Sequence, residues 1–252
     1  MKKKVCILTF EGNAVATELF SLLFNQYDLS MIYIEDERFA LAKAIHKKRG
    51  LRWVWYNYLF VQYAKIFHQE HKPQPSWREL ADRHKNRFYK ISSFVTLEGV
   101  QIIKDKGIDI GVMIGTPLAP QALLDAPCLG MLNLHQGRIP DYRGKPPAYW
   151  EHYYQEPVMH VTVHRAITKL DAGEILAETT FSIKENPHWI VSKFQASFVS
   201  CQLIQEAIEK VIKQAKGEIR AITHKTRTVP STGILLRESC QLLWMILKGK
   251  TK

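Results

Sequence analysis

The chain has 252 residues, of which 46% are hydrophobic, and its 35 Lys and Arg outnumber its 24 Asp and Glu for a net charge of +11. This mixture argues against disorder, and no apolar run reaches the ~20 residues that a membrane-spanning helix needs. The four cysteines have no paired spacing, so they indicate neither a disulfide framework nor a metal site. We therefore expect a cytoplasmic protein of one large domain or slightly more, with no metal.

The N-terminal residues follow a strand–helix–strand order. Apolar runs predict strands at 5–10 and 29–34, and the residues between them predict a helix at 14–24. Its apolar positions have helical spacing and comprise Val15, Leu19, Leu22 and Leu23. This order favours an α/β fold, a Rossmann-like and mostly parallel sheet flanked by helices.

The turn after the first strand, Glu11-Gly12-Asn13, lacks the full Gly-x-Gly-x-x-Gly pattern of a dinucleotide site. Ligands nevertheless collect at the carboxyl ends of parallel strands, so Gly12 and Asn13 are candidates to line a substrate cleft. A plain turn at the start of a helix explains these two residues equally well.

Residues 38–90 interrupt the alternation and read as a helical insertion. Helices are expected at 40–49, 53–70 and 77–85, and the sheet is expected to resume at 88–91. Residues 37–90 carry 13 Lys and Arg against 4 Asp and Glu, so most of the excess positive charge lies there.

The insertion has many aromatic residues between Trp53 and Phe67, and they are interleaved with or flanked by the basic residues Arg49, Arg52, Lys65 and Lys72. Three interpretations remain open: packing or a homodimer contact, binding of an anionic substrate such as a nucleotide-linked sugar, and peripheral contact with a membrane. Nucleic acid binding is the least favoured use of this composition. The amphipathic last residues, 240–252, add weight to a membrane or partner contact.

The remaining residues return to alternating elements. Helices are expected at 97–106 (ended by Gly107), 119–124, 146–154 and 191–213, and strands at 108–114, 158–165 and 174–183. The long helix at 191–213 has one apolar stripe, formed by Phe194, Phe198, Cys201, Ile208 and Val211. His160 and His164 lie four residues apart in one strand, and we expect them to be core or cleft-wall residues because no further zinc ligands are indicated.

The motif Asn133-Leu134-His135 closes an apolar run, and Asp171 follows His135 after 36 residues. Residues i and i+2 of an extended segment point to the same face, so Asn133 and His135 can address one ligand atom. A histidine suits proton transfer near neutral pH, and a carboxylate beside it would fix its tautomer. Taken alone, an Asn-x-His pair is more typical of a strand end and a satisfied histidine.

The surrounding sequence changes that balance. Between Ile108 and Ile183 the chain resembles the folate-dependent formyltransferase family, nearest in type to its sugar and glycinamide ribonucleotide members. The resemblance rests on the following segments: Ile108-Asp109-Ile110-Gly111-Val112-Met113-Ile114-Gly115, Leu129-Gly130-Met131-Leu132-Asn133-Leu134-His135, Ile139-Pro140-Asp141-Tyr142-Arg143-Gly144, and Val161-Thr162-Val163-His164 through Leu170-Asp171-Ala172-Gly173-Glu174-Ile175-Leu176.

The resemblance implies that Asn133, His135 and Asp171 are catalytic and that 10-formyltetrahydrofolate donates a formyl group to a primary amine. It also implies a loop whose backbone holds the folate pterin, formed by Ile114, Gly115, Thr116, Pro117 and Leu118. Arg143 would order the loop beside His135 or contact an anionic substrate group. The catalytic domain would span 1–216, with a short C-terminal extension at 217–252.

The acceptor is less defined than the donor. Arg138 stands where relatives are apolar, which makes it a candidate substrate contact. The residues after Gly217 are too few for the β-barrel of tRNA-directed relatives, so we expect a small amine, such as an amino sugar on a nucleotide. The alternatives are hydrolysis of formyltetrahydrofolate, and a catalytically quiet protein that binds membrane or nucleic acid through its basic insertion.

Overall fold

The computed structural model describes residues 2–35, 75–186, 188–222, 225–227 and 232–248. The chain divides into two compact units, one formed by Met1–Glu35 and Pro73–Arg227 and the other by Asp36–Lys72 and Thr228–Lys252. Only helix α9 (Thr232–Lys248) is described in the second unit. The helices expected at 40–49 and 53–70 lie outside the described residues.

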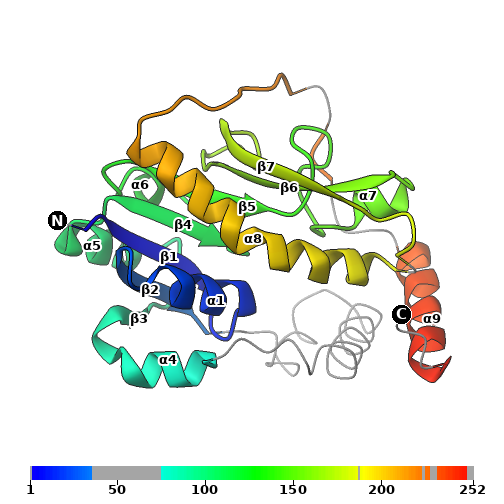
Figure 1. The fold of residues 1–252 in the computed structure, drawn as a ribbon, viewed down its shortest axis with the longest axis horizontal. Helices are drawn as coiled ribbons and strands as arrows, with labels where there is room; N and C mark the ends of the chain where they lie inside the picture. Colours follow the sequence, from blue (N-terminus) through cyan, green and yellow to red (C-terminus); the bar gives the residue numbers. More distant parts are fainter. Residues whose placement is uncertain (1, 36–74, 187, 223–224, 228–231, 249–252) are drawn as a thin grey trace. The chain divides into compact units, whose positions relative to one another are not determined.

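A seven-stranded sheet, with strand order β3-β2-β1-β4-β5-β6-β7, forms the centre of the first unit as far as it is described (Figure 1). The strands are β1 (Lys4–Phe10), β2 (Asp28–Ile34), β3 (Phe88–Lys90), β4 (Ile110–Ile114), β5 (Met131–His135), β6 (Val158–Arg165) and β7 (Ile175–Ser182). Strands β1 to β5 are parallel to one another, whereas β6 pairs antiparallel with β5 and β7 pairs antiparallel with β6. The predicted mostly parallel α/β fold is confirmed.

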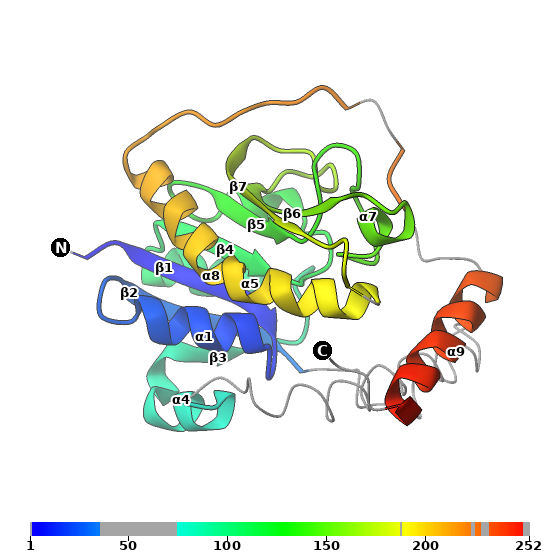
Figure 2. The ribbon, with the colours of Figure 1, turned by 45° about the vertical axis from the view of Figure 1, so that its right-hand side comes forward.

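Helices pack on both faces of the sheet (Figure 2). Helices α1 (Ala14–Leu23) and α8 (Trp189–Ile212) cover one face, and α5 (Leu97–Lys106) and α6 (Gln121–Leu124) cover the other. Because side chains alternate along a strand, Val5 and Ile7 join the core under α1 and α8, while Cys6 and Leu8 join the core under α5 and α6. Burial on both faces explains why β1 is a continuous apolar run.

Two residues assigned to apolar stripes are not buried. On α1, Leu19 is fully buried but Leu22 is 43% exposed. On α8, Phe198 is 49% exposed, whereas Cys201, Ile208 and Val211 of the same predicted stripe are buried. Helical spacing alone assigned exposed positions to the buried face, because the neighbouring helix and the sheet cover only part of the surface of each helix.

The first unit extends further along the chain than the sequence indicated. Helix α4 (Trp77–Arg83), the 3-10 turn η3 (Lys85–Arg87) and β3 belong to it, although they fall within the expected insertion at 38–90. At the other end, the unit continues past residue 216 to Arg227. Backbone pairing of Ile175 with Glu218 and of Gly144 with Arg227 is the physical reason.

The helix expected at 146–154 is much shorter, because α7 comprises only Trp150–Tyr153. Ala148 has a φ of +63°, which is incompatible with a right-handed helix, and its N–H donates to the Gln136 carbonyl at 2.7 Å. The hydrogen bond of Ala148 therefore connects the residues before α7 to the segment that follows His135.

None of the helices in the described ranges is both long enough and apolar enough to cross a membrane. In the same ranges, no group of three or more His, Cys, Asp or Glu side chains is arranged to hold a metal ion.

A matched pair of substitutions on α1 tests this packing. Leu19→Ala removes a fully buried side chain, so we expect the free energy of unfolding to fall by about 2–5 kcal/mol. Leu22→Ala should change it by no more than about 0.5 kcal/mol, because that side chain is 43% exposed. Urea denaturation measures both, and equal losses would contradict the described face of α1.

Candidate functional site

Polar residues meet where β1, β4 and β5 end. Strand order reverses between β1 and β4, the position at which open α/β sheets bind ligands. Asn13 follows β1 and caps α1 by accepting from the Ala16 N–H at 3.1 Å. A β-carbon built on Gly115 would lie 3.6 Å from Asn13 Nδ2, so the turns after β1 and β4 lie side by side.

His135 and Asp171 form a buried pair at the end of β5. His135 is 5% exposed and Asp171 is 6% exposed. His135 Nδ1 lies 3.5 Å from Asp171 Oδ2, and His135 Nε2 lies 3.0 Å from the Tyr142 carbonyl oxygen. Both ring nitrogens thus face oxygen acceptors, and the imidazolium form can donate a hydrogen bond at each.

Asn133 joins the same cluster. Its Nδ2 lies 3.3 Å from Asp171 Oδ1 and 3.1 Å from His164 Nε2, so its two N–H groups point to the carboxylate and the second imidazole. The structure therefore brings together the three residues that the sequence selected. To donate a hydrogen bond to a substrate oxygen, the Asn133 amide would have to break its contact with Asp171 or with His164.

His164 is the residue whose contribution the sequence reasoning missed. It is buried, its Nδ1 lies 2.9 Å from the Arg165 carbonyl oxygen, and its Nε2 lies 3.7 Å from Asp171 Oδ1. A register shift between Val163 and His164 interrupts the pairing of β6 with β7, a place where strands commonly re-aim side chains. The cross-strand register Asn133↔His164 would have identified it, but the register depends on the tertiary fold.

The environment of Asp171 favours its charged form. Burial acts to raise the pKa of this carboxyl, but nearby His135 and His164 and the hydrogen bond from the Gly144 N–H outweigh burial and lower the pKa to about 2. The Gly144 N–H donates to Asp171 Oδ2 at 2.9 Å. Asp171 is thus a fixed negative charge at neutral pH, held against His135.

The loop after β4 has features suited to a flat heterocycle. Thr9 Oγ1 donates to the Ile114 carbonyl at 3.0 Å, which fixes the start of the loop. Thr116 Oγ1 is buried without a hydrogen-bond partner among the described residues, and Leu118 is 52% exposed. An unsatisfied hydroxyl next to an exposed apolar side chain fits a ligand that has both an apolar face and polar edges.

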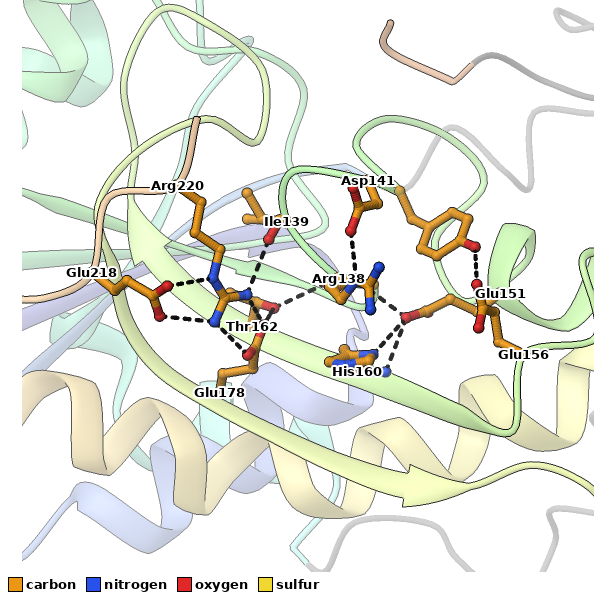
Figure 3. A network of polar contacts seen from close by, with 12 residues as sticks. Arg138, Ile139, Asp141, Glu151, Glu156, His160, Thr162, Glu178, Glu218 and Arg220 are labelled. Atoms are coloured by element: carbon orange, nitrogen blue, oxygen red, sulfur yellow. Dashed lines mark hydrogen bonds and ion pairs between the residues drawn. The ribbon is translucent and has the colours of Figure 1, made fainter. Parts of the chain in front are cut away.

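The two arginines named as substrate contacts lie in different surroundings. The Arg138 side chain is 41% exposed, and its Nε donates to Asp141 Oδ2 at 2.6 Å (Figure 3). Arg143 is only 3% exposed, and its Nη1 donates to the carbonyl of Leu170 at 3.1 Å. Arg143 thus supports the loop that carries Asp171, whereas Arg138 is accessible to solvent.

Buried Glu151 ties the segment after His135 to β6 (Figure 3). Its Oε1 accepts from the backbone N–H of Arg138 at 3.2 Å and from that of His160 at 3.1 Å, and it lies 2.9 Å from His160 Nδ1. His160 thus has a structural partner, Glu151, on α7.

Burial and a hydrogen bond to Glu156 raise the pKa of Tyr142, so this phenol stays protonated.

Comparison with known proteins addresses the origin of this site. No model of a known protein family matches the chain. The methionyl-tRNA formyltransferase of Staphylococcus epidermidis is 25% identical over 146 residues, which are 58% of this chain and 47% of that protein. The chain thus spans less than half the length of this relative. The sequence similarity is thus to a folate-dependent formyltransferase, over a little more than half of this chain.

Solved structures of formyltransferases and of a deformylase share the fold. Phosphoribosylglycinamide formyltransferase from Bacillus halodurans has a TM-score of 0.57 at 19% identity, covering 84% of this chain and 96% of that one. The sugar 3N-formyl transferase WlaRD, solved in the presence of dTDP and 5-N-formyl-THF, has a TM-score of 0.57 at 16% identity, covering 90% and 70%. A formyltetrahydrofolate deformylase from Pseudomonas syringae has a TM-score of 0.59 at 14% identity, covering 91% and 66%.

The lowered pKa of Asp171 should make the free energy of unfolding depend on pH. A carboxyl whose pKa falls on folding, here from 3.8 to about 2, stabilises the fold above about pH 4 and loses that contribution as the pH falls to about 2. Asp171→Asn should therefore lower the free energy of unfolding at pH 6 by roughly 2 kcal/mol, and the difference from the natural protein should shrink toward pH 2. Urea denaturation at several pH values measures this.

The exposed carboxylate of Asp105 on α5 offers a control. Asp105→Asn should leave the pH dependence of stability close to that of the natural protein. A pH-independent deficit for Asp171→Asn would contradict the assignment of a depressed pKa to this carboxyl.

Proposed function

We propose that this protein transfers a formyl group from 10-formyltetrahydrofolate to the primary amine of a nucleotide-linked amino sugar. The observation that carries the proposal is the cluster that Asn133 forms with buried His135 and Asp171 at the carboxyl ends of the central strands. Similarity to a methionyl-tRNA formyltransferase, and to the fold of an enzyme solved with 5-N-formyl-THF, supports the donor.

The cluster suits attack of an amine on a formyl carbon. Negative charge grows on the formyl oxygen during the attack, and the imidazolium of His135 would stabilise it once substrate displaces the Tyr142 carbonyl from Nε2. The bond between the formyl carbon and the folate nitrogen then breaks, the leaving nitrogen takes the proton of His135, and the proton lost by the attacking amine restores the imidazolium. Asp171 stays ionised and keeps the ring of His135 in one orientation. Asn133 would donate to the same oxygen after releasing His164 or Asp171, and its Oδ1 is an acceptor for the N–H of the attacking amine.

The loop of Ile114 to Leu118 would hold the folate. The buried hydroxyl of Thr116 lacks a partner among the described residues and is available for a polar edge of the pterin, while Leu118 offers apolar surface. Asn13 lies beside Gly115, so the turn at Gly12 and Asn13 would border the same cleft.

The choice of acceptor rests on Arg138 and on the solved structures. Arg138 lies three residues after His135, the last residue of β5, and 41% of its side chain is exposed. A guanidinium at this position can pair with a phosphate of the substrate. The match to WlaRD, solved with dTDP, covers 90% of this chain and supports a nucleotide-linked acceptor.

Incubation with 10-formyltetrahydrofolate and a panel of nucleotide-linked amino sugars tests the proposal. We expect an N-formyl product with at least one sugar, detected by mass spectrometry. Arg138→Ala should raise the KM for that sugar about tenfold or more and leave the KM for the folate nearly unchanged, because the proposed phosphate contact is made to the sugar nucleotide. Folate turnover that needs no amine would replace this proposal with the hydrolase activity for which the deformylase is named.

Variants of the cluster test the roles of individual residues. His135→Ala and Asp171→Asn should each lower kcat by roughly 100-fold or more, because each removes a preorganised charge. His164→Gln should lower kcat by about tenfold, since it disturbs the amide of Asn133 without removing His135. Steady-state kinetics measure these effects, and His84→Gln, at the residue that follows α4, serves as a histidine control. Unchanged turnover in His135→Ala would contradict the site.

A further inference from the structure

The residues after α8 return to the catalytic site and are anchored there at two points. The strap is defined here as residues 217–222 and 225–227. Its first anchor is a backbone pair in which the N–H of Ile175 donates to the Glu218 carbonyl at 2.8 Å and the N–H of Glu218 donates to the Ile175 carbonyl at 2.9 Å. The strap thereby starts beside the first residue of β7.

Arg220 strengthens this first anchor (Figure 3). Its guanidinium makes two hydrogen bonds to the Glu178 carboxylate, each of 2.9 Å, and donates to the carbonyl of Ile139 at 3.1 Å. Glu178 in turn accepts from Thr162 Oγ1 at 3.2 Å, and the same hydroxyl donates to the Gly137 carbonyl at 3.0 Å. Arg220 thus links the strap, the sheet and the segment that follows His135.

The second anchor pairs Arg227 with the loop residue Gly144, which contacts Asp171. The N–H of Arg227 donates to the Arg143 carbonyl at 2.7 Å, and its carbonyl accepts from the Lys145 N–H at 3.2 Å. The residue between them, Gly144, donates its own N–H to Asp171. A β-carbon at Gly144 would lie only 2.2 Å from the Arg227 carbonyl oxygen, and its φ is +107°, so the two backbones require glycine here.

The side chain of Arg227 is held by aromatic rings. Its guanidinium lies 5.0 Å from the ring centre of Tyr154, 5.6 Å from that of Trp150 and 5.8 Å from that of Tyr142. Its Nη1 also donates to the Tyr154 hydroxyl at 3.0 Å. Such cation–π contacts hold a guanidinium firmly. Tyr142 links this anchor to the site, because its carbonyl lies against His135 Nε2.

We propose that Arg227 is a positioning residue for the formyl transfer: it fixes residues 142–144 so that the Gly144 N–H stays on Asp171 and the Tyr142 carbonyl stays on His135. Arg227 touches neither of the two side chains itself and acts through the loop between them. Its kinetic effects rest on the proposed function, whereas its effect on the Gly144 amide does not.

The experiment compares Arg227→Ala, Arg227→Lys and Lys225→Ala in the full chain. Lys225 is an exposed cation of the same strap and serves as the matched control. Arg227→Ala should lower kcat roughly 10- to 100-fold with little change in the KM for the folate, because the cluster is misplaced and the folate loop is not. Arg227→Lys keeps a cation among the rings and should recover most of kcat, and Lys225→Ala should match the natural protein.

A double substitution separates positioning from general destabilisation. If Arg227 acts through Asp171, adding Arg227→Ala to Asp171→Asn should lower kcat no further, because the group that it positions is already lost. A loss in the double variant equal to the product of the two single losses would overturn the proposal. Equal thermal stability of Arg227→Ala and Arg227→Lys, together with different kcat values, would support it.

The amide resonance of Gly144 gives a readout independent of substrate. We expect its chemical shift to move and its hydrogen exchange to speed up at least tenfold in Arg227→Ala, and to be unaffected in Lys225→Ala. An unchanged Gly144 amide in Arg227→Ala would overturn the proposal even if transfer is observed. A changed amide with no formyl transfer by the natural protein would uphold the strap and refute the proposed function.

Discussion

The carboxylate of Asp171 is the group on which the arrangement of the site depends. It lies buried between His135, His164 and the amide of Asn133, with the Gly144 N–H on one oxygen. A buried charge is costly unless it is paired, and these donors lower the pKa of Asp171 despite its burial. The same contacts fix the orientations of the imidazole and the amide. One electrostatic requirement, to satisfy this carboxylate, therefore organises the whole site.

The fold meets this requirement by bringing distant segments to one place. Strand β5 supplies Asn133 and His135, the antiparallel strand β6 supplies His164, and the loop to β7 supplies Asp171. The switch to antiparallel pairing after β5 sets His164 opposite Asn133. The loop that follows β5 contributes the Gly144 N–H, which donates to Asp171. The strap pairs with the same loop through Arg227.

Part of this could be predicted from the sequence. The periods of the apolar residues predicted the parallel strands, and the i, i+2 spacing predicted that Asn133 and His135 share a face, because both signals are local. His164 and Arg227 could not be recognised in this way, since their roles depend on strand register and on a return of the chain after α8. Leu22 was misassigned for a related reason: helical spacing does not reveal how wide an arc the rest of the fold covers.

The central claim is that Asp171 is ionised within this cluster well below the usual pKa of an aspartate. Carboxyl carbon NMR of the protein labelled with ¹³C-aspartate, with Asp171→Asn used to assign the resonance, measures this directly. We expect the Asp171 signal to keep its ionised chemical shift down to about pH 3 and to titrate only near pH 2. Titration of that signal at pH 4 or above in the folded protein would contradict the account.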